Sequence, residues 1–109
     1  MHEGEIPPGT LYLLILKTLA GGAEMHGYEI ANSIQQISDE VLQVEEGSLY
    51  PALQRMLIKG WVTAKWGATA ENRRARYYRL TPSGRKQLEV EVSQFQRVVE
   101  AITRVLRTA

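Results

Sequence analysis

The stretch EGSLYPALQRMLIKG, residues 46–60, decides the fold because it joins a helix start, an apolar stripe and a polar outer face. Ser48 can cap free backbone amides, and Pro51 is tolerated in a helix only within its first turn, so we expect the helix to begin near Ser48. Apolar residues recur in it at steps of three and four, which places them on one inward face: Leu49, Leu53, Met56 and Leu57.

The outer face of this helix suits phosphates and base edges, because it is polar and no carboxylate follows Glu46. It is formed by Ser48, Pro51, Gln54 and Arg55, with Tyr50 and Lys59 at its flanks. The stretch therefore has the pattern of a DNA recognition helix.

Two segments after the helix alternate in polarity and are rich in aromatic and β-branched residues, namely 61–66 (WVTAKW) and 75–80 (ARYYRL). They predict two antiparallel strands. The stretch between them, 67–74 (GATAENRR), is polar, contains turn formers and ends in an arginine pair, so it predicts a long basic hairpin tip. A polar-faced helix followed by such a hairpin is the order of a winged helix-turn-helix, in which the tip is the wing.

Two further helices are predicted upstream. Residues 10–20 form an apolar-rich core helix that the glycine pair at 21–22 stops. The next helix opens at residues 26–28 and is the first of the helix-turn-helix pair, with its inward spacing given by Ile30, Ala31, Ile34 and Ile37. The link 38–46 is longer than a tight turn, and three of its side chains are expected to pack beneath it: Val41, Leu42 and Val44.

His26 and Tyr28, at the start of that helix, each allow two interpretations. Histidine is a common metal ligand. The only other histidine is His2 and the chain has no cysteine, so we expect no metal site. His26 is expected to cap the helix or to meet a backbone or phosphate group. Tyr28 is either a buried ring with a satisfied hydroxyl or a donor to a DNA phosphate.

The C-terminal part predicts one long helix that needs a partner. It starts with a cap and a proline at residues 81–83 (TPS). About 26 residues at about 1.5 Å each reach about 40 Å, longer than a small winged domain can cover. We therefore expect packing on its own domain and on a second subunit, the alternative being a purely intramolecular helix. Val98 and Val105 widen an unbroken heptad seam formed by Leu88, Val92, Phe95, Val99, Ile102 and Leu106.

Charge is distributed unevenly although the net charge is only +1. Residues 1–46 carry eight acidic residues and one basic residue, a net charge of −7, whereas residues 59–86 carry eight basic residues and one acidic residue, a net charge of +7. One or two arginines would be expected on any solvated hairpin. A net charge of +7 in this window favours a nucleic-acid partner.

Length and composition bound the remaining possibilities. With 109 residues, 44% of them hydrophobic, we expect one compact unit, in which residues 1–80 are a winged helix-turn-helix DNA-binding domain and residues 81–109 a dimerisation helix. The fold class is mainly α with a small β-hairpin. No segment has the pattern of a signal peptide or approaches the length of about 20 apolar residues that crosses a bilayer, so a cytoplasmic protein is expected. No catalytic motif appears, so we expect neither enzymatic activity nor a cofactor.

The chain resembles the PadR-like family of transcriptional regulators over nearly its whole length. Four motifs in one order carry the resemblance: GTLYLLILKTLA at 9–20, HGYEI at 26–30, GSLYPAL at 47–53 with GW at 60–61, and YYRLTPSGRKQL at 77–88. The resemblance implies a homodimeric winged-helix repressor or activator whose C-terminal helix makes the dimer. It also implies that small aromatic or amphipathic compounds can act as effectors.

These observations together predict a regulator, a repressor, that binds a near-palindromic operator as a homodimer. Its two recognition helices would enter successive major grooves about 34 Å apart. The candidates for base edges are Ser48, Gln54 and Arg55. The candidates for phosphates or the adjacent minor groove are Tyr50, Lys65, Arg73, Arg74 and Arg76, with Tyr28 and Pro51 on the same surface.

An effector pocket is expected between the N-terminal and C-terminal helices, where Tyr12, Phe95 and Val99 would meet an aromatic ligand. Trp61 and Trp66 are alternative ligand contacts, and ordinary core packing is the alternative for all of these side chains. The alternative function is a winged-helix module that binds protein and not specific DNA. Salt separates the two functions, because binding through several phosphates weakens steeply as salt rises.

Overall fold

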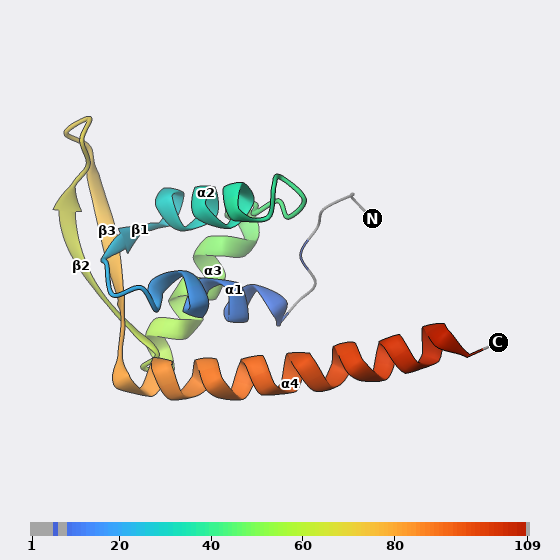
Figure 1. The fold of residues 1–109 in the computed structure, drawn as a ribbon. Coiled ribbons are helices and arrows are strands. Elements are labelled where there is room, and N and C mark those ends of the chain that lie inside the picture. Colours follow the sequence, from blue (N-terminus) through green and yellow to red (C-terminus); the bar gives the residue numbers. More distant parts are fainter. Residues whose placement is uncertain (1–5, 7–8, 109) are drawn as a thin grey trace.

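The computed structural model describes residues 6 and 9–108 and contains helices and one small antiparallel sheet (Figure 1). The sheet has the strand order β1-β3-β2. The elements of the described chain are α1 (Thr10–Leu19), β1 (Met25–His26), α2 (Gly27–Ile37), α3 (Glu46–Ile58), β2 (Val62–Ala68), β3 (Arg74–Leu80) and α4 (Pro82–Arg107). The mainly α fold with a hairpin is therefore confirmed.

The strand β1 was not expected, and the prediction of two strands alone is wrong. Its two residues pair with β3, Met25 opposite Tyr78 and His26 opposite Tyr77. A strand of two residues is too short to display the alternation on which a prediction from sequence depends. The hairpin tip is also shorter than expected, because β2 and β3 continue to Ala68 and Arg74.

The core lies where α1, α2, α3 and the base of the hairpin meet. Ile15, Leu19, Ile30, Leu53 and Met56 are completely buried there. The expected inward face of α3 is confirmed, since three of its four residues are buried and the fourth is partly buried against the core, these being Leu49, Leu53, Met56 and Leu57.

The start of α3 differs from the expectation. The helix begins at Glu46, two residues earlier than expected, and its N-cap Glu45 forms no side-chain capping hydrogen bond. The backbone supplies the first bonds, because the amides of Ser48 and Leu49 both donate to the carbonyl of Glu45. Ser48 is therefore not the cap, and Pro51 lies beyond the first turn inside the helix. The expected positions of both residues were wrong.

Helix α2 starts as expected and ends at Ile37, directly before the predicted link 38–46, but two side chains near its end are not buried as expected. The His26 side chain accepts a hydrogen bond from the Glu29 amide at 3.4 Å, and the Glu29 carboxylate accepts one from the His26 amide at 3.0 Å, which is a capping box. Ile37 and Val41 are 83% and 65% exposed, so their predicted inward positions are wrong. The helix ends at Ile37, and the chain then turns away through two residues with positive φ before Leu42 and Val44 return to the core.

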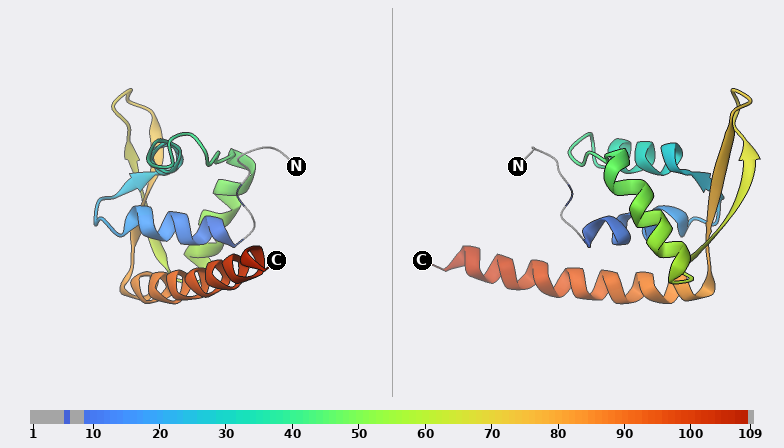
Figure 2. Two further views of the ribbon diagram at one scale, coloured as in Figure 1. Left: turned by 45° about the vertical axis from the view of Figure 1, so that its right-hand side comes forward. Right: turned by 180° about the vertical axis from the view of Figure 1, so that it is seen from behind.

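Helix α4 starts at Pro82 after the N-cap Thr81, whose hydroxyl accepts a hydrogen bond from the Gly84 amide at 2.9 Å. The expected cap and N-terminal proline are confirmed. The helix lies beneath α1, and its C-terminal end projects beyond the body on the side opposite the hairpin (Figure 1 and the right-hand view of Figure 2). Leu88 packs against the core, whereas the residues beyond it become progressively exposed.

None of the helices in the described part of the chain is long and apolar enough to span a membrane.

Candidate nucleic-acid interface

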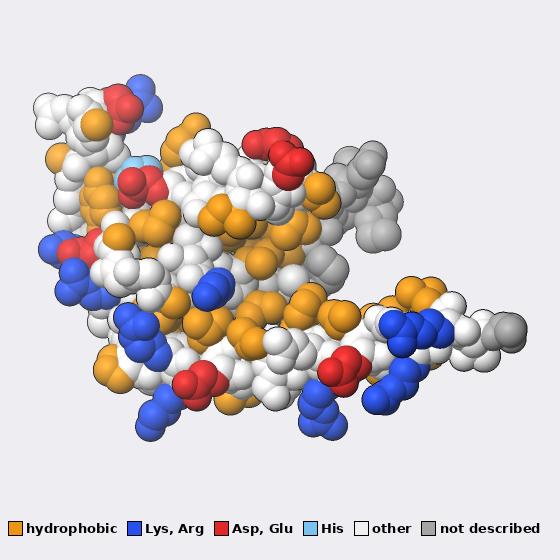
Figure 3. All heavy atoms as spheres, in the orientation of Figure 1, with side chains coloured by type: hydrophobic (Ala, Val, Ile, Leu, Met, Phe, Trp, Pro, Cys, Tyr) orange, Lys and Arg blue, Asp and Glu red, His pale blue; other side chains and the backbone are white. Residues whose placement is uncertain are grey.

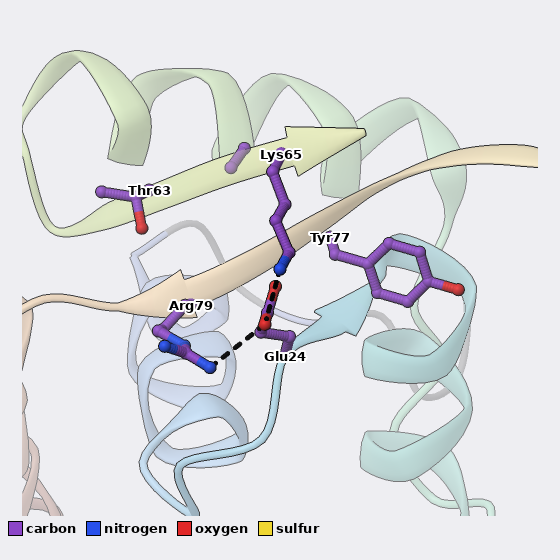
Figure 4. Close-up of a pocket in the computed structure, with 6 residues that line it drawn as sticks. Glu24, Thr63, Lys65, Tyr77 and Arg79 are labelled. Atoms are coloured by element: carbon purple, nitrogen blue, oxygen red, sulfur yellow. Dashed lines mark hydrogen bonds and ion pairs between the residues drawn. The ribbon is translucent and has the colours of Figure 1, made fainter. Parts of the chain in front are cut away.

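The wing formed by β2 and β3 has two faces of different chemistry, because successive side chains of a strand point to opposite sides. The register places Lys65 opposite Tyr77 and Trp66 opposite Arg76. On the outer face, the Glu24 carboxylate forms ion pairs with Lys65 of β2 at 3.2 Å and with Arg79 of β3 at 3.1 Å (Figure 4). The two cations of this face are therefore paired within the protein.

The inner face of the wing borders a groove of about 400 Å³. From behind, α3 and the wing diverge from the point where α3 passes into β2 (Figure 2). The described residues that line the groove include two arginines and no carboxylate, and they are His26, Gly27, Tyr50, Gln54, Trp66, Arg74, Ala75, Arg76 and Tyr78. This groove is therefore a basic concave surface beside the polar face of α3.

Arg74 and Arg76 both lie over the ring of Trp66. The guanidinium carbon of Arg74 is 4.3 Å from the ring centroid, and that of Arg76 is 5.6 Å away. Trp66 itself is 56% exposed. A stacked guanidinium keeps its positive charge and its N–H donors. This face of the wing therefore presents to the groove two cations that form no ion pair with any carboxylate in the described part of the chain.

Tyr50 forms the wall of the groove on the α3 side. Its ring packs against Gly27 at the start of α2. Beneath the groove, burial raises the pKa of the Tyr78 hydroxyl, the nearby Arg76 lowers it, and Tyr50 raises it, so that the net direction is upward. Tyr78 therefore remains a neutral hydroxyl at physiological pH.

The three expected base-reading residues do not lie together. Gln54 lines the groove, whereas Ser48 lines a small cavity with Leu11 and Val44 that does not border the wing. Arg55 lies on the flank of α3 that faces α1, where its Nε donates a hydrogen bond to the Tyr12 hydroxyl.

The remaining predicted contact residues are exposed, with one pairing that the sequence did not reveal. Pro51 is exposed on α3, and Arg73 is exposed at the hairpin tip, where its amide donates to the Thr69 hydroxyl at 3.2 Å. Tyr28 is 71% exposed, so the alternative of a buried ring is wrong. Lys65 is held by Glu24 on the outer face, away from the groove.

The sequence did not indicate which residues the groove brings together, although a phosphate contact was one alternative for His26. His26 and Gly27 line the groove through the pairing of β1 with β3, and the sequence gives no sign of that pairing. Trp66 was considered only as an alternative ligand contact. The alternation of 61–66 and 75–80 would have indicated that Trp66 shares a face with Arg76 if the hairpin register had been known.

The expected effector residues belong to α1 and α4, two helices that pack against each other. Tyr12 packs edge-to-face on Trp61 with ring centroids 5.7 Å apart, while Phe95 and Val99 are 46% and 42% exposed on α4. A mainly apolar cavity of about 580 Å³ lies elsewhere, between α1 and α2, and Leu14 and Ile34 are among its lining residues. Within the described residues, no group of three or more His, Cys, Asp or Glu side chains could hold a metal ion.

The order of helices, the polar face of α3 and the basic wing define a winged helix-turn-helix DNA-binding regulator. Residues 15–90, well over half of the chain, match the family model described as the transcriptional regulator PadR-like family. The chain belongs to this family. Its members are transcriptional regulators that bind DNA and are not enzymes.

Similar proteins agree with this assignment. A transcriptional regulator from Clostridium thermocellum is 28% identical with a TM-score of 0.80, and the similarity covers 88% of this chain and 92% of that one. A PadR family transcriptional regulator from Eggerthella lenta is 26% identical with a TM-score of 0.76, covering 93% of this chain and 85% of that one. A Lysinibacillus sphaericus protein named uncharacterized protein X is 29% identical over 102 residues, which are 94% of this chain and 93% of the relative.

Proposed function

We propose that the protein is a repressor that binds a near-palindromic operator as a homodimer, with the groove between α3 and the wing placed against the DNA. One observation carries this proposal: the groove brings Gln54 and Tyr50 of α3 together with two arginines, and no described carboxylate pairs with these arginines or lines the groove. Such a surface attracts phosphates and places an amide side chain where it can read a base edge.

The groove gives its residues different roles in the proposal. Gln54 contacts a base edge, because an amide can form two hydrogen bonds with adenine. Tyr50, Arg74 and Arg76 hold phosphates, and Arg73 at the hairpin tip reaches a phosphate or the minor groove. Tyr28 and Pro51 lie on the same proposed surface.

Ser48, Arg55 and Lys65 receive lesser roles than the sequence suggested. Arg55 would have to leave the Tyr12 hydroxyl to reach a base, and Lys65 would have to leave the Glu24 carboxylate to reach a phosphate. Each exchange replaces an existing interaction, so its net contribution to affinity is small.

The dimer is proposed to form through α4. Its seam residues Phe95, Val99, Ile102 and Leu106 are between 42% and 78% exposed. A contiguous apolar stripe of this kind is typical of a surface that a partner covers. In this arrangement residues 1–80 bind DNA and residues 81–109 join two copies, within one compact unit. Figure 3 shows apolar side chains along α4 where it extends past the body.

A small aromatic or amphipathic effector is proposed to act at the junction of α1 and α4, beside Tyr12, Phe95 and Val99. The contact of Tyr12 with Arg55 supports this placement, because it connects α1 to α3. An effector changes operator affinity only if it binds one arrangement of the two DNA-binding heads more tightly than the other.

The proposal is tested by binding of the purified protein to DNA from upstream of its own gene, with unrelated DNA as the control, over a salt series and with the mass of the complex recorded. A repressor of this kind binds its operator as a dimer, selectively, and with affinity that falls steeply as salt rises. A transcription assay from the same promoter then tests repression, with and without small aromatic compounds. Absence of DNA binding at every salt concentration would instead support the protein-interaction function.

A further inference from the structure

Each face of the wing holds two cationic side chains, but by different means. On the outer face, Glu24 binds Lys65 and Arg79 with its carboxylate (Figure 4). On the inner face, the indole ring of Trp66 lies beneath Arg74 and Arg76. The first arrangement offsets one of the two positive charges, whereas the second leaves both intact.

The hairpin register explains why one ring meets both arginines. Trp66 pairs directly with Arg76, and Arg74 lies two residues before Arg76 in β3, opposite Ala68. Directly opposed and diagonal neighbours on one face of a sheet are both within reach of a large aromatic side chain. Two like charges would repel each other at this spacing. The electron-rich face of the indole offsets part of that repulsion.

Trp66 has no role in the core that would account for a tryptophan at this position. It is 56% exposed and lines the groove, whereas the core is built from other residues. Stacking fixes the plane of a guanidinium while its N–H edges remain available for a bidentate contact with a phosphate. The Nε atom of Arg76 is buried and has no hydrogen-bond partner among the described residues, so its position does not depend on a hydrogen bond from Nε.

We infer that Trp66 is a positioning residue that holds Arg74 and Arg76 in place for DNA phosphates and acts through these arginines without reading DNA itself. The inference rests on the proposed function of the groove. Pre-organisation of the two arginines lowers the entropy lost when they bind phosphate, so affinity for all DNA sequences depends on the ring.

The test is a cycle of variants of the full chain in DNA binding. Trp66→Leu removes the ring face and retains an apolar side chain, and Trp66→Phe retains a smaller ring face. Trp66→Leu should weaken binding about tenfold on operator and unrelated DNA alike, and Trp66→Phe should recover most of this loss. In a background of Arg74→Ala with Arg76→Ala, Trp66→Leu should have no further effect.

Two results of this cycle would overturn the inference. If Trp66→Leu weakens binding equally in the background without the arginines, Trp66 contacts DNA directly. If Trp66→Leu leaves affinity unchanged in the otherwise unaltered protein, the ring does not position the arginines. Thermal unfolding of each variant establishes that folding is retained, and Lys65→Leu on the same strand is the matched control for a change confined to the outer face.

A second measurement separates this inference from the function on which it rests. Nuclear magnetic resonance of the protein without DNA should show the side-chain protons of Arg74 and Arg76 shifted upfield by the ring current of Trp66, and Trp66→Leu should abolish the shift. Ordinary shifts in the unaltered protein would overturn the stacking. If the shifts are present but the protein does not bind DNA in a salt-dependent manner, the stacking holds and the proposed function of the groove fails.

Discussion

The ring of Tyr50 lies against Gly27, where an added Cβ would be 2.7 Å from the ring carbon Cε1 and 2.8 Å from the hydroxyl oxygen. Tyr50 belongs to α3, and Gly27 is the first residue of α2. The contact therefore joins the two helices of the helix-turn-helix pair at the groove. It also gives a physical reason for a glycine in HGYEI and a tyrosine in GSLYPAL, because the ring occupies the space of the missing side chain.

Substitution of Gly27 by alanine should reduce DNA binding more than stability. The atoms that the new methyl group meets are at the far end of the Tyr50 side chain, so the ring can move aside, and the unfolding free energy should change by less than about 1 kcal/mol. The displaced ring would lose its place in the groove. We expect operator affinity measured by fluorescence anisotropy to fall about tenfold.

Gly21→Ala is the matched control, because nothing lies within 4 Å of an added Cβ there and the residue does not line the groove. It should leave affinity unchanged. Equal affinities for the Gly27 and Gly21 variants would show that the position of Tyr50 is irrelevant to DNA binding.

The two faces of the wing should differ in their effect on salt dependence. Removing both inner cations by Arg74→Ala with Arg76→Ala should reduce the slope of log affinity against log salt by about 2, since each phosphate contact contributes about 0.9. The outer pair, changed by Lys65→Ala with Arg79→Ala, should leave the slope nearly unchanged, because both cations already interact with Glu24 and neither lines the groove. A salt titration of both double variants makes the comparison, and a larger change for the outer pair would contradict the proposed orientation on DNA.

The proposed dimer interface is tested with two separate variants, each of which places one negative charge on a different side of α4. Val99 and Val90 are 42% and 46% exposed and lie nine residues apart, which places them on opposite sides of the helix. Val99→Glu should break the dimer, because it puts a carboxylate into the apolar seam. Light scattering after size-exclusion chromatography should then report the mass of one chain, while Val90→Glu should remain dimeric. A dimer that survives Val99→Glu and dissociates with Val90→Glu would assign the interface to the other face.

The junction between the hairpin and α4 should be sensitive to a single methyl group. A Cβ added at Gly84 would lie 2.1 Å from the Trp61 carbonyl oxygen and 2.6 Å from Leu80 Cδ1, and the carbonyl belongs to the backbone. Gly84→Ala should therefore lower the unfolding free energy by about 1 to 3 kcal/mol in a urea titration. Ser83→Ala, an exposed position in the same turn, should cost much less. A similar loss for both variants would indicate a general effect on the start of α4.

The sequence predicted the helices and the hairpin because each depends on local patterns. The inward face of α3, the His26 cap and the start of α4 at Thr81 and Pro82 followed from periodicity and capping chemistry. Errors occurred where a local preference was overridden. Backbone bonds to Glu45 start α3 without help from Ser48, and the turn after Ile37 leaves that side chain in solvent.

The amino-acid sequence by itself determined the order of the elements, the accumulation of positive charge around the hairpin and, through its motifs, the PadR-like family. Only the tertiary structure decided which cations pair with a carboxylate. Whether an arginine faces Glu24 or Trp66 depends on strand register and on the approach of β1 to β3, both of which join residues far apart in the chain. A period-2 pattern defines the two faces of a strand but not which residues each face contacts. Lys65 and Arg74 are both cationic residues of the wing, yet Lys65 contacts Glu24 on the outer face and Arg74 contacts Trp66 on the inner face.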